Sequence, residues 1–509
     1  MRRILLGVLV SLVATWICLF IFDTSAHQSV SPKELMILAS VQTPSLSKST
    51  THLNESTTIK NTTPAFDTSV DEFAAVRREE NLHIVISSDC SLYQRWQVLT
   101  SFHSANAVGQ SGQRTWLISG CNEQEKENIE KTLIDHFMDG SKRPIAHFTP
   151  DYADMSRYPG PFASGLKKRT FVNRHGKLVK SPYGNRYKFN NKPNALLHWV
   201  TSSDGIARLR SDEAIVYIDP DFLFLAPLRL PEGVSIEPGQ PVAQRYGLGA
   251  QWVTFNRSAM CGAVDTLCAT ISEKEVNQFY SAGPPYIVHS ADLEKLATEW
   301  VRLVPRTYDQ YPLLYAEMFA YSAAAATFDL KHRLIPSLMT GCMVGWPQEK
   351  SNSALFDSAQ AFITETRAQI SAGQEKKPRH VSWGGASSCF KNNMRPPPLL
   401  HYCQHYTSDA FDRGIAKRQV PHNILSCETS KGISGGEVHR GPLELAALGV
   451  ALKKNAGDGN IANKKSNTRD RTTGRAHRPG SLAWNELAAC SVFRGVAHAR
   501  DEHCLLHGN

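Results

Sequence analysis

The chain has 509 residues and a formal net charge of +9. Most of this charge is local, because residues 453–478, a stretch rich in Gly, Asn and Thr, contain eight basic and two acidic residues, a balance of +6. Such a stretch is typical of a solvated, disordered tail. Because the chain also carries a lumenal targeting pattern, described next, we expect no nucleic-acid partner.

The N-terminus has a membrane-targeting pattern. Met1-Arg2-Arg3 precedes the uncharged apolar run 4–22, which is long enough to cross a hydrocarbon core of about 30 Å as a helix. The arginines predict a cytoplasmic tail at 1–3 and a lumenal chain after the anchor at 4–22. A cleaved signal peptide, with Thr24-Ser25-Ala26 as the small-residue site, is the alternative. The length of the apolar run favours an uncleaved anchor.

The composition divides the rest of the chain into three parts. Residues 23–78 are rich in Ser and Thr and poor in aromatic residues, so we expect a disordered stem. Residues 79–427 have the pattern of one extended globular α/β unit, and residues 428–509 that of a mostly disordered basic tail. Ten of the eleven cysteines lie outside the anchor. In an oxidising lumen some should form disulfides, with a connectivity that the sequence leaves open.

Strand-like and helix-like segments alternate in the globular part. Residues 82–87 and 115–119 are β-rich runs, whereas 92–107 and 123–137 have helical spacing. An irregular connector over 149–190 leads to a helix over 193–200, with proline in its first turn. This alternation predicts an α/β fold with a parallel sheet covered on both faces. Two later helices are expected over 292–304 and 311–327.

The motif Asp219-Pro220-Asp221 separates two apolar runs, 214–218 and 222–225. Two carboxylates at the mouth of a buried strand form a hard-oxygen site for Mn²⁺ or Mg²⁺. Such a metal can hold a nucleotide diphosphate and neutralise it as a leaving group. The alternative is a strand end whose aspartates only start a turn. Ser88-Asp89 also follows a strand, so both motifs are expected at the carboxyl edge of the sheet, where ligands bind in open α/β folds.

Several short motifs resemble, in order, those of the peptidyl-serine galactosyltransferases and hydroxyproline arabinosyltransferases of plants and algae. They span residues 82 to 406 and are Ser88-Asp89 with Tyr93 and Trp96-Gln97, Asn191-Lys192-Pro193 with His198-Trp199, Asp219-Pro220-Asp221, Gly283-Pro284-Pro285-Tyr286-Ile287, Glu317-Met318 with Tyr321, and His401-Tyr402. The arabinosyltransferases tend to have glutamate at the position of Asp219, which favours the serine-galactosyl branch. The stem and the chain after about residue 427 have no counterpart in this resemblance.

The resemblance implies a single-pass type II enzyme of the Golgi (or ER) membrane, with a GT-A fold in which helices flank a Rossmann-like mixed or parallel sheet. It implies transfer of a sugar, with galactose favoured, from a UDP-sugar to a Ser or hydroxyproline hydroxyl of a secreted protein, with retention at the anomeric carbon. A hydroxyproline arabinosyltransferase and a catalytically inactive lumenal UDP-sugar-binding protein of the same fold are the alternatives. A metal-dependent phosphoesterase would need a second metal site, and no second acidic-and-histidine cluster is evident in the sequence.

The resemblance also assigns the metal ligands. In GT-A enzymes an aspartate pair, usually joined by a distal histidine, holds Mn²⁺ on the diphosphate, which points to Asp219, Asp221 and His401. Imidazole with carboxylates suits Mn²⁺ better than Ca²⁺. His405 is a rival for the third position, and an ordinary packed or surface histidine is the alternative for His401. Mg²⁺ remains possible as the metal.

The other candidate residues are assigned to the nucleotide sugar. Ser88 and Asp89 would meet the uridine base or ribose, and Lys192 the phosphates or the sugar, since a mobile point charge suits a diphosphate. Glu317, in an otherwise apolar segment, must be paired or functional if buried. It is the candidate catalytic residue, placed to stabilise a cationic sugar centre or to orient the acceptor. A solvated surface lysine is the alternative for Lys192, a structural ion pair is the alternative for Glu317, and a role without ligand contact is the alternative for Asp89.

Some residues of the motifs are expected to pack rather than to bind. His198 lies on an apolar helix, where packing is the favoured role. Tyr286, Trp346 and Trp383 could stack on sugar or peptide, but core packing is the better expectation for any single aromatic residue.

Overall fold

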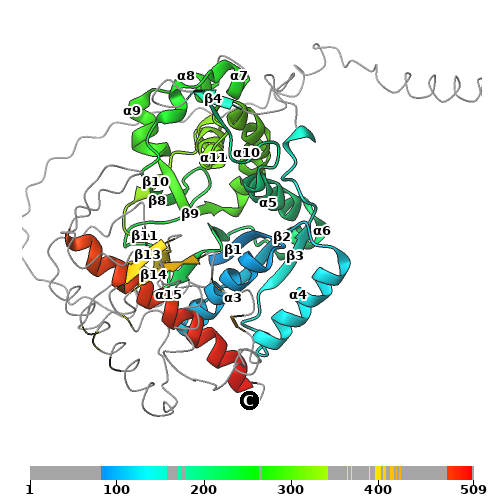
Figure 1. Ribbon diagram of the computed structural model, residues 1–509. Coiled ribbons are helices and arrows are strands. Elements are labelled where there is room, and N and C mark those ends of the chain that lie inside the picture. The colour runs from blue at the N-terminus through cyan, green and yellow to red at the C-terminus, as the bar shows by residue number, and fades with distance from the viewer. Residues whose placement is uncertain are drawn as a thin grey trace, which may run out of the picture. The chain divides into compact units, whose positions relative to one another are not determined.

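The computed structural model describes the part of the chain that builds a central sheet and its surrounding helices (Figure 1). The described residues are 82–157, 170–172, 178–262, 266–341, 396–402, 405–408, 413–417 and 479–506, with a few single residues between 361 and 425. Residues 1–78, expected to form the cytoplasmic tail, the anchor and the stem, lie outside them, as does the basic stretch 453–478. Within the described ranges, no helix combines the length and the apolar character that a bilayer crossing requires.

The central sheet has seven strands in the order β10-β8-β9-β6-β1-β2-β3. The strands are β1 (Leu82–Asp89), β2 (Gln113–Ser119), β3 (Ile145–Thr149), β6 (Ala214–Ile218), β8 (Val242–Arg245), β9 (Ala282–His289) and β10 (Arg333–Ile335). β1 pairs in parallel with β2 and β6, and β2 pairs in parallel with β3. β9 runs antiparallel to both β6 and β8. The expected α/β fold is therefore confirmed, with a mixed sheet that is mainly parallel.

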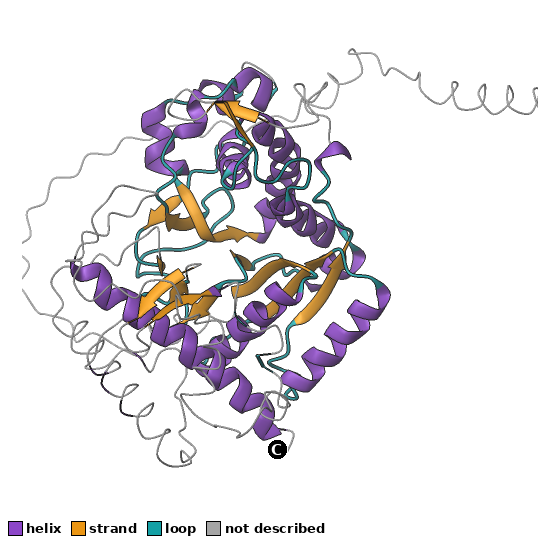
Figure 2. Ribbon diagram, in the orientation of Figure 1, coloured by secondary structure: helices purple, strands orange, loops and turns teal. Residues whose placement is uncertain are grey.

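Helices cover both faces of this sheet (Figure 2). One side carries α5, α10 and α11, and the other carries α3, α4 and α15. The buried strand β1 contributes side chains to the apolar clusters on both faces of the sheet, because successive side chains of a strand point to opposite faces. Ile84 and Ile86 belong to the apolar cluster that includes Phe102 of α3, whereas Val85 belongs to the cluster that includes Trp199 of α5. The helices are α3 (Leu92–Ala107), α4 (Glu123–His136), α5 (Asn191–Thr201), α10 (Ser290–Gln310), α11 (Ala316–Thr327) and α15 (Pro479–Leu506).

Shorter elements connect these layers. A separate three-stranded sheet has the order β11-β12-β7 and is formed by β11 (Met339–Gly341), β12 (Leu399–His401) and β7 (Phe222–Phe224). Two antiparallel pairs are β4 (Thr170–Val172) with β5 (Leu178–Lys180), and β13 (His405–Ser408) with β14 (Arg413–Ala416). The short helices are α6 (Ser203–Arg208), α7 (Arg257–Cys261), α8 (Leu267–Thr270) and α9 (Glu273–Glu275).

Two helix predictions were wrong at one end. α10 was expected to end at Val304, but it continues through Pro305 to Gln310. Its buried stripe extends past the proline to Thr307 and Tyr308, so packing offsets the hydrogen bond that proline removes. α11 was expected from residue 311, but it begins at Ala316.

β9 is a strand despite Pro284 and Pro285, which cannot donate hydrogen bonds to a neighbouring strand. Its pairing with β6 reaches only as far as Tyr286. Its pairing with β8 shifts register between Ala243 and Gln244, opposite the two prolines. Both prolines therefore lie where the ladder is already interrupted, as at a β-bulge.

The end of the tail that was expected to be mostly disordered is a helix, whereas residues 428–478 lie outside the described residues. Pro479–Leu506 forms α15, and residues 487–491 of this helix are all buried. A disulfide joins Cys490 to Cys389, and a hydrogen bond of 2.8 Å joins Glu502 Oε2 to His103 Nδ1 of α3. The expected pairing of cysteines is confirmed by this disulfide and by Cys90–Cys121 and Cys261–Cys268.

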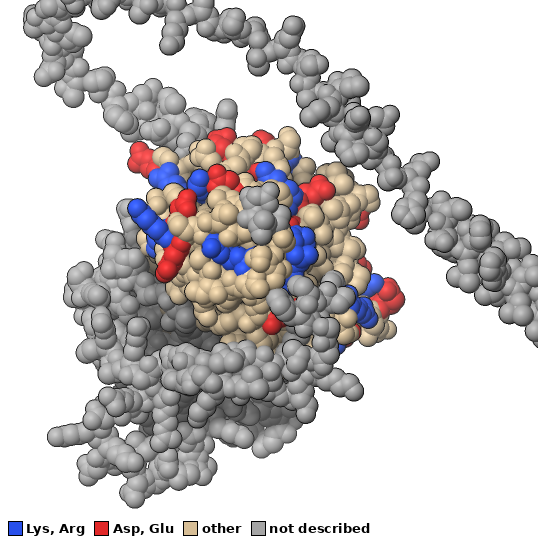
Figure 3. Space-filling view, turned by 90° about the horizontal axis from the view of Figure 1, so that it is seen from above, with Lys and Arg blue, Asp and Glu red and all other residues tan. Residues whose placement is uncertain are grey.

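The surface seen in Figure 3 carries charges of both signs. Lys and Arg lie among Asp and Glu, with uncharged residues between them. On this face the described residues therefore form no field of a single sign, which is the feature that attracts a large oppositely charged partner.

Candidate active site

The motif Asp219-Pro220-Asp221 lies at the carboxyl edge of the central sheet. β6 ends at Ile218, directly before it, and β7 begins at Phe222, directly after it. β1 is parallel to β6, with Ile86 opposite Ile218, so Asp89 at the end of β1 lies at the same edge. The sequence prediction that both acidic motifs share one edge is therefore confirmed.

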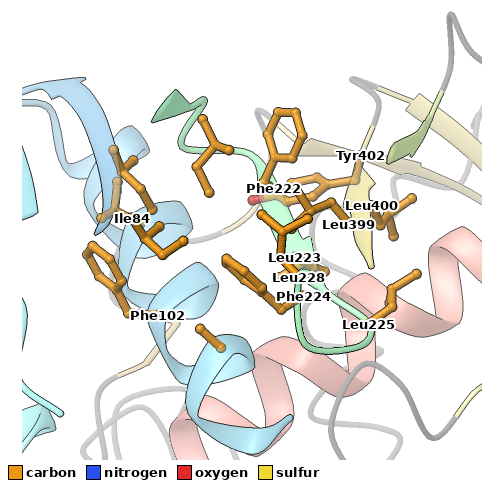
Figure 4. Packing of buried hydrophobic residues seen from close by; sticks show 14 of the residues in the cluster. Ile84, Phe102, Phe222, Leu223, Phe224, Leu225, Leu228, Leu399, Leu400 and Tyr402 are labelled. Atoms are coloured by element: carbon orange, nitrogen blue, oxygen red, sulfur yellow. The ribbon is translucent and has the colours of Figure 1, made fainter. Parts of the chain in front are cut away.

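The small sheet brings His401 to this motif. β12 runs antiparallel to β7 with His401 opposite Phe222, and the Tyr402 N–H donates to the Asp221 carbonyl oxygen at 3.1 Å. The two strands hold this register through apolar packing against β1 and α3 (Figure 4), where Ile84 and Phe102 face Phe224 and Leu400 across the cluster. The Phe224 N–H also donates to Ser104 Oγ of α3 at 3.0 Å.

Asp219, Asp221 and His401 form a cluster with the chemistry of a metal site. One ligand atom from each residue lies within 4.8 Å of the others. His401 Nε2 is 3.2 Å from Asp221 Oδ1, and the imidazole stacks on the Phe222 ring with centroids 4.7 Å apart. His405, the rival ligand, lies in β13, and its side chain is outside the described part of the structure.

Two lysines, the buried Lys417 and the partly buried Lys192, neutralise this acidic cluster. Lys417, which follows β14, contacts Asp221 Oδ2, and its Nζ lies 4.7 Å from the centre of the Tyr402 ring. Burial opposes the ionisation of Asp221, but Lys417 and His401 outweigh it and hold the pKa of this carboxyl well below its usual range. Lys192, in the first turn of α5, lies 2.5 Å from Asp219 Oδ1. This ion pair is the contact that the described residues give to Asp219 Oδ1.

Glu317 is the second partner of Lys192, with Oε2 at 3.4 Å from Nζ. Its side chain is 1% exposed, at the start of α11. Burial raises the pKa of Glu317 to about 7; Lys192 lowers it and Asp219 raises it. The backbone is fixed on both sides, because the Glu317 N–H donates to Tyr187 Oη at 3.0 Å and Trp300 Nε1–H donates to the Glu317 carbonyl oxygen at 2.9 Å. The expectation that a carboxylate here must be paired if buried is met by Lys192.

Asp89 and Ser88 already make contacts within the chain. Asp89 Oδ1 accepts from the Ser91 N–H at 3.0 Å, and Oδ2 contacts Lys188. Burial opposes ionisation of Asp89, but Lys188 and Ser91 outweigh it and lower its pKa. Ser88 is buried, and its Oγ accepts from Trp116 Nε1–H at 2.8 Å. Contact with uridine therefore stays a prediction for both residues.

Two of the four residues that were expected to pack are described in the structure. His198 pairs with His147 of β3, at 2.9 Å between Nδ1 and Nε2. Tyr286 is buried in the core. Trp346 and Trp383 lie outside the described residues.

Sequence reasoning missed Lys417 and Gly341 at the site, and the packing role of Gly283. Lys417 belongs to no motif and reaches Asp221 only through the fold. Gly341 of β11 lies beside His401, and a methyl group at its Cα would be 2.5 Å from the His401 carbonyl oxygen. A methyl group on Gly283 would be 2.4 Å from the ring of Tyr246. Glycine at 283 was noted as part of a motif, but only coordinates show that the two glycines make room for their neighbours.

The residues present fit a divalent cation. Two carboxylates and an imidazole are a donor set for Mn²⁺, and one ligand atom of each residue lies within 4.8 Å of the others. Asp219, Asp221 and His401 would hold the ion.

Comparison with known proteins finds a curated protein that is similar in sequence to this chain. No protein-family model matches the chain. The curated peptidyl serine alpha-galactosyltransferase of Arabidopsis thaliana is 25% identical over 283 residues, which are 53% of this chain and 28% of that protein. The chain resembles a peptidyl-serine galactosyltransferase. This confirms the resemblance carried by the motifs, over less than a third of the galactosyltransferase's own length.

Solved structures give weaker similarities. The galactosyltransferase LgtC, in complex with donor and acceptor sugar analogues, has 11% identity and a TM-score of 0.32, over 73% of this chain and 96% of LgtC. The bifunctional glycosyltransferase WbbM has 12% identity and a TM-score of 0.28, over 55% of this chain and 41% of WbbM. These values are too low to support an assignment beyond the resemblance to the serine galactosyltransferase.

Proposed function

We propose that the chain is a metal-dependent, retaining glycosyltransferase that moves a sugar, with galactose favoured, from a UDP-sugar to a Ser or hydroxyproline hydroxyl of a secreted protein. The cluster of Asp219, Asp221 and His401 beside the pair of Lys192 and Glu317 carries this proposal. The similarity to a serine galactosyltransferase supports the reaction class. The proposed location is a Golgi or ER membrane, where the predicted anchor at 4–22 would hold the catalytic part in the lumen.

Asp219, Asp221 and His401 would hold Mn²⁺ or Mg²⁺. When bound, the ion supplies a Lewis acid that neutralises the departing diphosphate. Lys192 and Lys417 each contact one of the two aspartates. Each lysine can therefore exchange a carboxylate oxygen for a phosphate oxygen when a diphosphate arrives, because an ammonium group is a compact and rotatable donor.

The proposed transfer needs no separate base from the protein. The bond between the anomeric carbon and the diphosphate oxygen breaks, and the acceptor hydroxyl oxygen bonds to the same carbon. The hydroxyl proton passes to an oxygen of the departing phosphate. Glu317 is then available to contact the donor sugar, and Lys192 links it to Asp219, directly after β6.

Turnover of a panel of UDP-sugars, with and without Mn²⁺, tests this proposal. UDP-galactose, UDP-glucose and UDP-arabinofuranose are incubated with the chain and with peptides that carry Ser or hydroxyproline, and UDP release is measured. We expect metal-dependent turnover, with galactose transfer to one of the peptides. Preference for UDP-arabinofuranose would instead favour the arabinosyltransferase alternative, and absence of metal-dependent UDP binding would reject both.

Asp219→Asn is the matching variant, because it keeps the shape of the side chain and removes its charge. We expect turnover to fall at least about 100-fold, the upper end of the loss seen when even an outer partner of a metal ligand is changed. Asp212→Asn is the control. The Asp212 side chain is 70% exposed, and its ion pair with Arg210 is long, at 3.8 Å. Wild-type turnover in Asp219→Asn would contradict the metal assignment.

A further inference from the structure

Two buried oxygen atoms beside the candidate active site lack hydrogen-bond partners. They are Tyr286 Oη and Glu317 Oε1, and neither has a partner among the described residues. Both side chains are 1% exposed. Buried polar groups are almost always hydrogen-bonded, and leaving them unpaired costs free energy, so an orphaned pair at a functional site indicates a missing partner.

Packing connects these two residues through Tyr321 and Trp300. Glu317 and Tyr321 are four residues apart in α11, so they lie on the same helix face, one turn apart. The rings of Tyr321 and Tyr286 have centroids 3.8 Å apart. Trp300 completes the contact, because its ring lies 4.9 Å from that of Tyr321 and 6.1 Å from that of Tyr286, while its Nε1–H donates to the Glu317 carbonyl oxygen.

The strand register connects the pair to the metal cluster. Tyr286 of β9 lies opposite Tyr217 of β6, so both side chains are on the same face of the sheet. Tyr217 Oη donates to the carbonyl oxygen of Lys192 at 3.1 Å, and Lys192 Nζ joins Asp219 to Glu317. Tyr286 is therefore paired in the sheet with the residue that contacts Lys192, the lysine that joins Glu317 to Asp219.

The two atoms are chemically complementary. Burial, and then the negative charges of Glu317 and Asp219, raise the pKa of the Tyr286 hydroxyl well above its usual value, so it stays a hydrogen-bond donor. Glu317 Oε1 is an acceptor when the carboxyl is ionised. A sugar hydroxyl both accepts and donates one hydrogen bond, which satisfies both atoms together.

We propose that Tyr286 Oη and Glu317 Oε1 form the subsite that recognises a hydroxyl group of the donor sugar, and that Tyr286 determines donor specificity. This inference rests on the proposed glycosyltransferase function. A site built to hydrogen-bond a hydroxyl rejects analogues that lack it by up to about 10⁴- to 10⁵-fold, because its own polar groups are then left unpaired.

Tyr286→Phe tests the inference, because it removes one oxygen and keeps the ring on Tyr321. The full chain is assayed with the UDP-sugar that it turns over best among UDP-galactose, UDP-glucose and UDP-arabinofuranose, and with each monodeoxy analogue of that donor. We expect kcat/KM for the complete donor to fall about 100-fold or more in the variant. The analogue that lacks the hydroxyl recognised by Tyr286 should give the same kcat/KM with the wild type and with Tyr286→Phe. Calorimetry should show unchanged binding of UDP with Mn²⁺.

Tyr321→Phe is the matched control. It removes a hydroxyl from the neighbouring ring, but that hydroxyl already pairs with His332 Nε2 at 2.9 Å. We expect a lower thermal midpoint and unchanged discrimination between the complete donor and its deoxy analogues.

Three results would overturn the inference. In the first, Tyr286→Phe has a lower thermal midpoint but the same ratio of kcat/KM between the complete donor and its deoxy analogues as the wild type. Tyr286 would then stabilise the fold, by binding a buried water, and would not recognise the donor. A second is an equal loss of activity with every analogue. The third is a wild-type chain that turns over none of the three UDP-sugars, which would also end the proposed function, whereas the first two leave that function intact.

Discussion

Gly341→Ala tests whether the position of His401 depends on the close approach of two strands. Gly341 of β11 lies opposite His401 of β12. An added methyl group would be 2.5 Å from the His401 carbonyl oxygen and 3.2 Å from its Cβ, whereas ordinary contacts begin at 3.4 Å. The obstacle is backbone in a packed interior with few voids, so the strands must separate by about 0.9 Å, the difference between 3.4 Å and 2.5 Å.

A displacement of this size is large for a metal ligand. Misplacing a functional group by about 1 Å can reduce turnover about 100-fold, which corresponds to about 2.7 kcal/mol. Overpacking also lowers the free energy of unfolding, typically by about 1–3 kcal/mol. We therefore expect Gly341→Ala to fold with a lower unfolding midpoint, to lose about 100-fold in kcat/KM, and to bind Mn²⁺ about 10- to 100-fold more weakly.

The assay combines calorimetric titration of Mn²⁺ with turnover and urea unfolding. Gly140→Ala is the control, because a methyl group there meets no atom within 4 Å. It should match the wild type in all three measurements. Gly341→Ala with wild-type Mn²⁺ affinity and turnover would refute the idea that β11 holds His401 in place.

Three further predictions concern the support of the site and the fold. Gly283→Ala would place a methyl group 2.4 Å from the Tyr246 ring, so we expect a loss of about 1–3 kcal/mol in urea unfolding; an unchanged midpoint would contradict this packing. Cys490→Ser removes the disulfide to Cys389 across 101 residues and should lower unfolding free energy by about 2–5 kcal/mol, whereas equal stability in both proteins would show that α15 is held without it. Burial lowers the pKa of His332 to about 3, so between that pH and about 6.5 the unfolded chain binds a proton that the folded chain does not, and stability falls as pH falls. His332→Gln should remove a slope of unfolding free energy that grows from about 0.7 kcal/mol per pH unit near pH 6.5 to about 1.4 near pH 5, and an identical slope in wild type and variant would exclude this histidine as the cause.

The strongest sequence signals predicted the framework of the sheet. β1, β2 and β6 are short apolar runs, and α3 begins where Ser91 caps the helix by accepting from the Gln94 N–H. Because the carboxyl ends of adjacent parallel strands meet at one edge, the placement of Asp89 and Asp219 at that edge followed from the order of the strands.

Elements without a polar face were harder to predict. The helix α11 is buried from Ala316 to Ala326, so it has no apolar stripe to mark its start. Likewise, the five successive residues 487–491 of α15 are all buried, so apolar and polar residues do not alternate there with the period of a helix. Their stability comes from tertiary packing, which a pattern along the chain does not record.

The site was predicted only where it is local in sequence. Asp219 and Asp221 lie on one short segment, whereas His401 was found through the family resemblance. Lys417 and Gly341 meet that segment through β14 and β11, from positions that carry no motif. Such long-range contacts depend on strand register, which a single sequence does not determine.

The central claim is that Asp219, Asp221 and His401 bind a divalent cation that docks a nucleotide diphosphate. Calorimetric titration of the chain with UDP, with and without Mn²⁺, tests it most directly, alongside His401→Gln. We predict UDP binding that requires Mn²⁺ in the wild type and is at least about 10-fold weaker in the variant. UDP binding of equal strength without Mn²⁺, or unchanged by His401→Gln, would contradict the account.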